Sequence, residues 1–239
     1  MATRTVDIPE IGAVTLYKRR GNRSLRLSVG ANGEIRVSLP SWVPYKAGEE
    51  FARAKAGWIA SHRKPHSAGL VHGQTIGKAH HLLFTPSAIA TRVTTRVRQN
   101  QIEITHPLDY DPAHPDIQRA AQSAGIRALR REAEALLPQR LRSLAQQTGF
   151  HFSSVEVKQL KSRWGSCSSK QEIVLNLFLM QLPWDLIDYV LLHELTHTKV
   201  MRHGAPFWKE LEKHVPRAKQ LRKDIANHHP ILATSPSSV

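Results

Sequence analysis

The stretch 191–208, LLHELTHTKVMRHGAPFW, combines three histidines and a glutamate at a spacing that suits metal chemistry. His193 and His197 are four residues apart, so on a helix both imidazoles lie on one face, as two ligands of one ion must. Glu194 directly follows the first histidine and can reach a water beside the ion without occupying the coordination sphere. Leu195 and the leucines before His193 predict a mostly buried helix, in which such polar residues have few structural uses.

A third ligand is expected shortly after this helix. The HExxH pattern alone occurs in many unrelated proteins, so the case for a metal depends on a further donor. His203 lies six residues after the second histidine, where Gly204 and Pro206 allow the chain to turn back. Three neutral imidazoles leave the fourth position of a tetrahedral zinc ion open for catalysis. Glu210 and Glu212 on the following helix compete for the role, and the turn favours His203.

The types of donor decide which metal and which reaction are expected. Nitrogen ligands favour zinc over magnesium or calcium, while iron, nickel, cobalt and manganese remain open. The ion acidifies a water and polarises the scissile carbonyl. Glu194 would take the proton of that water and pass it to the leaving amine. The motif therefore predicts a metal-dependent hydrolase, most simply a zinc metallopeptidase.

The first half of the chain is predicted to be rich in strands. Apolar and polar residues alternate in 14–20, 24–30 and 34–40, and again in 80–86, 91–99 and 101–107. An amphipathic helix is expected over 45–62. The segment PLDYDPAHP, rich in proline and aspartate, is typical of a connector. We therefore expect a basic β-rich region over 1–110 and the domain with the metal motif over 111–232, followed by a disordered tail at 233–239.

The second half predicts the elements that position the motif. A helix is expected over 116–148, with Pro138 as a point where it kinks or divides. Strands 155–160 and 172–179 would form a hairpin across the Gly- and Ser-rich RWGSCSSK. The helix that carries HExxH opens near Pro183, and two short helices follow. The fold class is thus α+β: an active-site helix with a small antiparallel sheet, preceded by the β-rich region.

Composition limits the kind of protein. A hydrophobic content of 41% and a charged content of 22% are ordinary for a soluble globular chain. No apolar run approaches the ~18 residues of a membrane helix, and the first residues lack the apolar core of a signal peptide. Cys167 is the only cysteine, so no disulfide can form within the chain. These features predict a cytoplasmic protein that does not bind membranes.

The chain is strongly basic, with a net charge of +15. Residues 1–106 hold 16 basic and 6 acidic residues, a balance of +10, and the remainder holds 18 and 13, a balance of +5. Such a surface attracts nucleic acid, nucleotides or acidic proteins. A generally basic, well-solvated surface explains the same numbers, so charge alone leaves the partner open.

Several motifs together resemble one family. They are HELTH with the later histidine, KSRWGSCSS, EIVLNL, LPWDLIDYVLLHEL and HGAPFW, with SLRLSVGANGEIRVSLP, GWIASH and HGQTIG in the first half. This set resembles the YgjP-like metallopeptidases, zincins related to the SprT-like and WLM groups. The resemblance implies that His193, His197 and His203 bind metal and that Glu194 is the general base. A metzincin would have glycine in place of Val200 and a methionine after Met201, and this chain has neither.

The resemblance also suggests how substrate binds. Zincins commonly hold an extended peptide against a strand near the metal, and 172–179 is the expected strand. Asn176 would then lie near substrate, and Arg163 could stabilise an anionic group of substrate or transition state. Phe207 and Trp208 are expected to pack beneath the metal loop.

Two other functions remain open at this point. The basic surface and Arg163 also suit a nucleotide phosphoanhydride, which would make the protein a nucleoside-triphosphate pyrophosphohydrolase. Alternatively, the protein is associated with nucleic acid, as a protease of nucleoprotein, by analogy with SprT-like proteins, or as a binding module. A groove beside the metal would favour a peptide substrate, and a closed basic pocket would favour a nucleotide.

Overall fold

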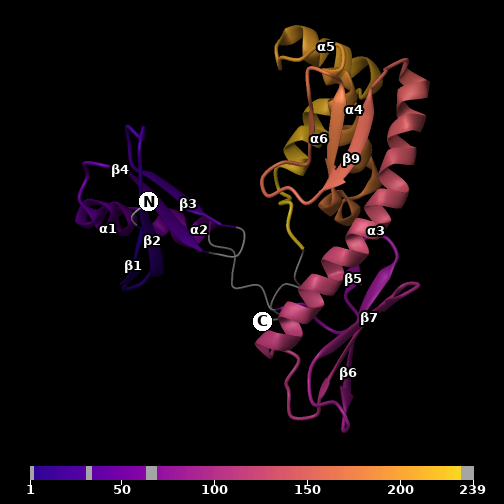
Figure 1. Ribbon diagram of the computed structural model, residues 1–239. Helices are drawn as coiled ribbons and strands as arrows, with labels where there is room; N and C mark the ends of the chain where they lie inside the picture. Colours follow the sequence, from indigo (N-terminus) through magenta and orange to yellow (C-terminus); the bar gives the residue numbers. More distant parts are fainter. Residues whose placement is uncertain (1–2, 31–33, 63–68, 233–239) are drawn as a thin grey trace. The chain divides into compact units, whose positions relative to one another are not determined.

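The computed structural model describes residues 3–30, 34–62 and 69–232. Within them the chain forms two compact units, one up to Ala68 and the other from Gly69 onward (Figure 1). Each unit has its own cluster of buried hydrophobic residues. The division therefore falls at 68/69 and differs from the boundary expected near residue 110. The expected disordered tail at 233–239 lies outside the described residues.

The first unit is a four-stranded sheet with two helices. Its strands are β1 (Thr3–Ile8), β2 (Gly12–Arg19), β3 (Arg26–Val29) and β4 (Ile35–Pro40), in the order β1-β2-β4-β3. β2 and β4 are parallel, and the outer pairs are antiparallel. The helix expected over 45–62 is broken at Lys55 into α1 (Tyr45–Ala54) and α2 (Ala56–His62). At Gly48, α1 lies so close to the sheet that a Cβ would come 2.8 Å from Leu39.

The second unit begins with another four-stranded sheet. Its strands are β5 (Thr75–Ile76), β6 (His80–Ser87), β7 (Thr94–Arg98) and β8 (Gln101–Pro107), in the order β5-β6-β8-β7. Ile102 and Ile104 of β8 are completely buried in the same cluster as α3 (Pro115–Thr148). This packing explains why the boundary falls before β5: the sheet and the helix share one core.

The helix α3 is the central helix of the second unit. Figure 1 shows it running past the β5–β8 sheet and on beside β9 and α4. It is not divided at Pro138 but continues as one helix, because its packing against the β5–β8 sheet and against β9 and α4 outweighs one missing hydrogen bond. It ends, as expected, at Gly149, whose φ of 69° is left-handed.

A three-stranded sheet follows α3. It consists of β9 (Ser154–Lys158), β10 (Gly165–Cys167) and β11 (Glu172–Asn176), in the order β10-β11-β9. The hairpin expected between 155–160 and 172–179 is wrong, because β9 and β11 run parallel. The antiparallel partner of β11 is β10, a strand within the segment that we expected to be a turn. The sheet is therefore mixed.

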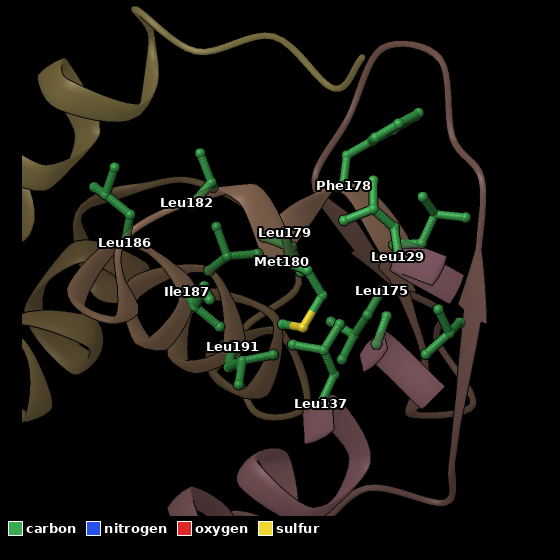
Figure 2. Packing of buried hydrophobic residues seen from close by; sticks show 14 of the residues in the cluster. Leu129, Leu137, Leu175, Phe178, Leu179, Met180, Leu182, Leu186, Ile187 and Leu191 are labelled. Atoms are coloured by element: carbon green, nitrogen blue, oxygen red, sulfur yellow. The ribbon is translucent and has the colours of Figure 1, made fainter. Parts of the chain in front are cut away.

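Helices complete the second unit: a 3-10 turn η1 (Leu177–Gln181), then α4 (Trp184–His197), α5 (Ala205–His214) and α6 (Ala218–Ile225). Figure 2 shows Met180 of η1 between Ile187 and Leu191 of α4 and Leu137 and Leu175 of the neighbouring elements. All five side chains are fully buried. The α+β class is confirmed, and among the helices of the described part none is both long and apolar enough to cross a membrane.

Candidate metal centre

The helix α4 carries the HExxH residues and is held firmly in place. Leu191 and Leu195 are completely buried in the core of the second unit. Asp188 accepts two hydrogen bonds from the Arg140 guanidinium of α3, at 2.8 and 2.5 Å. The Lys78 ammonium donates to the carbonyl of Leu182, just before the helix begins. Burial and these polar contacts fix the helix against both α3 and the β5–β6 turn.

Three histidine side chains converge at the end of this helix. His193 and His197 lie one turn apart on α4, and His203 approaches from the segment before α5. The Nε2 atom of His203 lies 2.9 Å from that of His193 and 3.0 Å from that of His197. Among the described residues these three form the one group of histidine, cysteine or acidic side chains placed to share an ion. The expected third histidine is therefore brought to the first two.

The two imidazoles of α4 are in the state that binds metal. His197 Nδ1 lies 3.2 Å from the carbonyl of Val200, an acceptor, so Nδ1 carries the proton and Nε2 presents a lone pair. Burial lowers the pKa of His197. Burial and the neighbouring charges of His197, His203 and Arg222 lower the pKa of His193 to about 3. Both imidazoles of α4 are therefore neutral near pH 7.

A cation fits this arrangement better than hydrogen bonds do. With the His197 lone pair pointing at His203, one proton on the His203 Nε2 can satisfy one of the two short contacts and leaves the other unsatisfied. An ion at the centre would engage all three Nε2 lone pairs at once, and three nitrogens are a typical zinc donor set.

Phe207 forms a rigid support beneath the three imidazoles. Its fully buried ring has centroid distances of 4.8 Å to His193, 4.6 Å to His197 and 4.8 Å to His203. The packing role expected for Phe207 is thus observed. Trp208 lies beside it, with its indole 6.0 Å from the His203 ring at 29° between the planes. The aromatic pair holds the His203 ring beside the two histidines of α4.

Glu194 is enclosed next to the strand β10. Its side chain is 6% exposed. A Cβ on Gly165 of β10 would lie 2.8 Å from both Cγ and Oε1 of Glu194, so only glycine leaves room for the carboxylate. Burial raises the pKa of Glu194 to about 8, and the positive charge of Arg163 acts in the opposite direction. A divalent cation on the nearby imidazoles would favour the ionised form further.

The competing acidic ligands are engaged elsewhere. Glu210 pairs with Lys213 and, at 3.6 Å, with Lys199. Glu212 lies 3.7 Å from Lys219. Neither belongs to the group of converging side chains. The geometry therefore favours His203 as the third donor, as the turn after the helix indicated.

The structure corrects the expectation for Asn176. This residue is 0% exposed, so it has no surface on which to meet a substrate. Its amide nitrogen donates to the carbonyls of Leu160 and Arg163, at 2.9 and 2.8 Å, and its Oδ1 accepts from the backbone N–H of Phe178 at 3.2 Å. Asn176 therefore fixes the loop between β9 and β10, the loop that carries Arg163. Arg163 itself is exposed, and its charge acts on Glu194.

The strand expected to border the cleft also needs correction. β11 is paired on both sides, by β10 and β9, and cannot accept a further strand. β10 is an edge strand of its sheet. The carbonyl of Trp164 accepts from Asn176, and the N–H of Ser168 donates to Glu172, so the backbone groups of Gly165 and Cys167 point to the open edge.

Two residues near the site were not found from the sequence. Gly165 was expected in the turn RWGSCSSK, near the strand that would hold substrate, and its contact with Glu194 was not foreseen. Arg222 of α6 received no role, yet its guanidinium lies 4.7 Å from the centroid of the Trp208 ring. Polar residues that recur with Trp208 along one face of a helix could have indicated the Arg222 contact. No local pattern could have indicated the contact between Gly165 and Glu194.

These features define a metal-dependent hydrolase site: three convergent imidazoles supported by the buried Phe207 ring, and a buried carboxylate beside an open strand edge. The comparison with protein families agrees. The model of the YgjP-like metallopeptidase domain matches residues 23–228, so the chain belongs to the YgjP-like family of metallopeptidases. The family supports a metal-dependent peptidase.

The similarity to solved structures covers a smaller part of the chain. The metallopeptidase zymogen abylysin of Pyrococcus abyssi is 28% identical, over 38% of this chain and 93% of that one, with a TM-score of 0.36. For the zymogen jannalysin of Methanocaldococcus jannaschii the identity is 23%, the coverage 38% and 93%, and the TM-score 0.34. No curated protein is similar enough to match. The family match therefore carries the identification.

Proposed function

We propose that the protein is a zinc-dependent metallopeptidase in which His193, His197 and His203 hold the ion and Glu194 is the general base. The observation that carries this proposal is the convergence of the three Nε2 atoms, at 2.9 and 3.0 Å, beside a buried carboxylate. A site that only stabilised the fold would have no use for Glu194. Zinc follows from the nitrogen donors.

Each residue has a distinct task in the reaction. The bound ion would supply Lewis acidity, which activates a water and polarises the scissile carbonyl. Glu194 takes a proton from the attacking water and delivers it to the nitrogen of the leaving amine. Burial raises the pKa of Glu194, and a divalent cation on the imidazoles would lower it again, which favours the ionised carboxylate that accepts the proton. Arg163, whose charge reaches Glu194, would stabilise negative charge that develops on the substrate.

The open edge of β10 favours a peptide over a nucleotide. Gly165 brings this strand against Glu194, and the outward backbone groups of Gly165 and Cys167 can pair with an extended chain. A peptide added there would pass directly beside the general base. Hydrolysis of a nucleoside triphosphate is the second candidate function, because the same ion and Glu194 could also activate a water for attack on a phosphoanhydride.

Replacing one residue tests the proposal. Glu194→Gln keeps the shape of the side chain and removes the proton acceptor. The variant should fold, retain about one zinc per chain, and hydrolyse substrate roughly two to four orders of magnitude more slowly. Metal analysis and assays on casein-like peptides and on nucleoside triphosphates measure these quantities side by side.

A matched control variant distinguishes the loss of the proposed catalytic carboxylate from the loss of any other glutamate. Glu210→Gln alters a glutamate that pairs with Lys199 and Lys213 outside the group of converging histidines, so it should keep both metal and activity. Full activity of Glu194→Gln on the substrate that the wild type cleaves would refute the general-base role. Cleavage of nucleotides without cleavage of peptides would replace the proposed reaction by the second candidate.

A further inference from the structure

A hollow lies between α5 and α6, next to the histidine cluster. Its volume is about 360 Å³, and its lining residues are Ala205, Trp208, Lys209, Glu212, Lys219 and Arg222. The four lining residues of α5 recur at the spacing of one helical face. The opposite face of the same helix buries Phe207 and Leu211 in the core. One helix thus supports the three imidazoles with one face and forms the wall of the hollow with the other.

Trp208 connects the hollow to the candidate metal centre. Its ring lies 6.0 Å from that of His203 and 6.2 Å from that of His193. The Arg222 guanidinium lies over the same indole, 4.7 Å from its centroid. A ligand in the hollow would therefore lie within one side-chain length of the reacting groups.

The charges of the hollow favour an anion. Lys209, Lys219 and Arg222 provide three positive charges, and Glu212 provides one negative charge. Glu212 lies 3.7 Å from Lys219, an exposed pair that contributes little to stability and opens readily. The Arg222 guanidinium is held over a flat indole and presents its remaining N–H groups, which suit a planar carboxylate.

We propose that this hollow is a carboxylate-binding subsite, which makes the enzyme selective for peptides that carry an acidic side chain or a free C-terminus near the scissile bond. The inference rests on the proposed peptidase function and extends it to the class of substrate. Arg222 and Lys219 bind the carboxylate, and Trp208 forms the apolar wall along which the substrate chain lies.

The test compares peptides that differ by one charge. Capped, amidated octapeptides of a single neutral sequence receive Glu or Gln at each position in turn, and a further pair ends in a free acid or an amide. The wild-type protein should cleave one of the Glu peptides, or the free acid, with a kcat/KM about tenfold above its neutral partner, the usual worth of a charge-assisted hydrogen bond. The better position shows whether a side chain or the C-terminus supplies the carboxylate.

Variants locate the selectivity in the hollow. Arg222→Met should reduce the Glu-to-Gln ratio to near one, mainly through KM, and Lys219→Met should reduce it by about half. Lys219 is 90% exposed, so its variant remains informative if Arg222→Met fails to fold. Lys223→Met is the matched control, because Lys223 is the next exposed cation of α6 and does not line the hollow. It should leave both the ratio and the basal rate unchanged.

A binding measurement separates this inference from the proposed function. The Glu194→Gln protein should bind a fluorescein-labelled Glu peptide more tightly than its Gln partner by about the same factor, as measured by anisotropy. If the wild type cleaves no peptide, the peptidase function fails and the binding comparison still decides the subsite. Cleavage or binding without any preference for the carboxylate, or a preference that survives in both Arg222→Met and Lys219→Met, overturns the subsite.

Discussion

The two units of the chain place their polar residues in opposite ways. In the second unit Glu194, His197 and Asn176 are buried, and each is held by a neighbour at short range. In the first unit every described charged residue is exposed or half-buried. Asp7 and Glu34 flank the end where β2 begins, while Arg19 and Arg26 lie at the other end.

The difference shows what each unit can do. A buried group has a perturbed pKa and a fixed position, which are the requirements of catalysis. An exposed group at the end of a sheet is solvated and mobile, which suits attraction of a charged partner over a distance. In the first unit, none of the described residues form a group of three metal donors. Substitutions in the two units should therefore differ in kind as well as in size.

The largest effect is expected from a proposed metal ligand of the second unit. His203→Ala removes one of three nitrogens, so zinc affinity should fall by at least about 100-fold and hydrolysis should be almost lost. Metal analysis after dialysis against a weak chelator measures the affinity. Undiminished zinc in this variant, together with loss of zinc in Glu210→Gln, would show that the third ligand is the glutamate.

A smaller effect is expected from the buried amide. Asn176→Ala leaves the carbonyls of Leu160 and Arg163 without their donor, which should cost about 2–3 kcal/mol in the free energy of unfolding. The matched residue of the first unit is Asn22, whose buried Nδ2 has no partner within the described chain. Asn22→Ala should therefore be close to neutral. Denaturant unfolding of both variants checks the contrast, and equal losses would contradict it.

The glycine beside Glu194, the proposed general base, gives the next contrast. Gly165→Ala places a methyl group 2.8 Å from Glu194 and should lower kcat by about tenfold, with zinc retained. Gly57→Ala in α2 meets nothing within 4 Å and should stabilise the helix by about 0.5–1 kcal/mol. Steady-state kinetics and thermal unfolding measure the two effects. A fully active Gly165→Ala protein would mean that Glu194 has room to move.

The local motif could be predicted from the sequence, whereas the pairing of strands that are far apart in the chain could not. The spacing of His193, His197 and His203 was enough to predict the cluster, because helix geometry and one turn determine it. The left-handed end of α3 at Gly149 was equally local. The parallel pairing of β9 with β11 was not predictable, because alternation identifies a strand and leaves its partner open. The burial of Asn176 is likewise a tertiary fact.

The boundary between the units shows the same limit. The proline- and aspartate-rich segment after β8 has the composition of a linker, which led to a division near residue 110. In the structure Ile102 and Ile104 share a core with α3, so the segment is an ordinary loop within one unit. The composition of a segment indicates how well water solvates it. Only the packing of the folded chain shows which elements share a core.

The smallest effect on hydrolysis, and the sharpest test of the comparison, comes from the first unit. Lys18 and Arg19 end β2 beside Pro40, and Lys18 donates to the carbonyl of Ser41. Trp42 follows at once and is 70% exposed. Proteins that bind single-stranded nucleic acid commonly place cations beside an exposed aromatic ring. The cations contact the phosphates, and the ring stacks on the bases.

Replacing Arg19, Arg20, Arg23 and Arg26 together by Gln should leave hydrolysis of short peptides unchanged, because these side chains lie in the unit without the histidine cluster. Binding of a labelled single-stranded oligonucleotide should weaken. The slope of log affinity against log salt should fall in magnitude by about three, since each lost phosphate contact removes about 0.7. Fluorescence anisotropy over a salt series measures the slope. A wild-type protein that binds no oligonucleotide at low salt would leave the basic end of the sheet without this partner, whereas a slope unchanged by the four substitutions would show that other cations of the chain bind the phosphates.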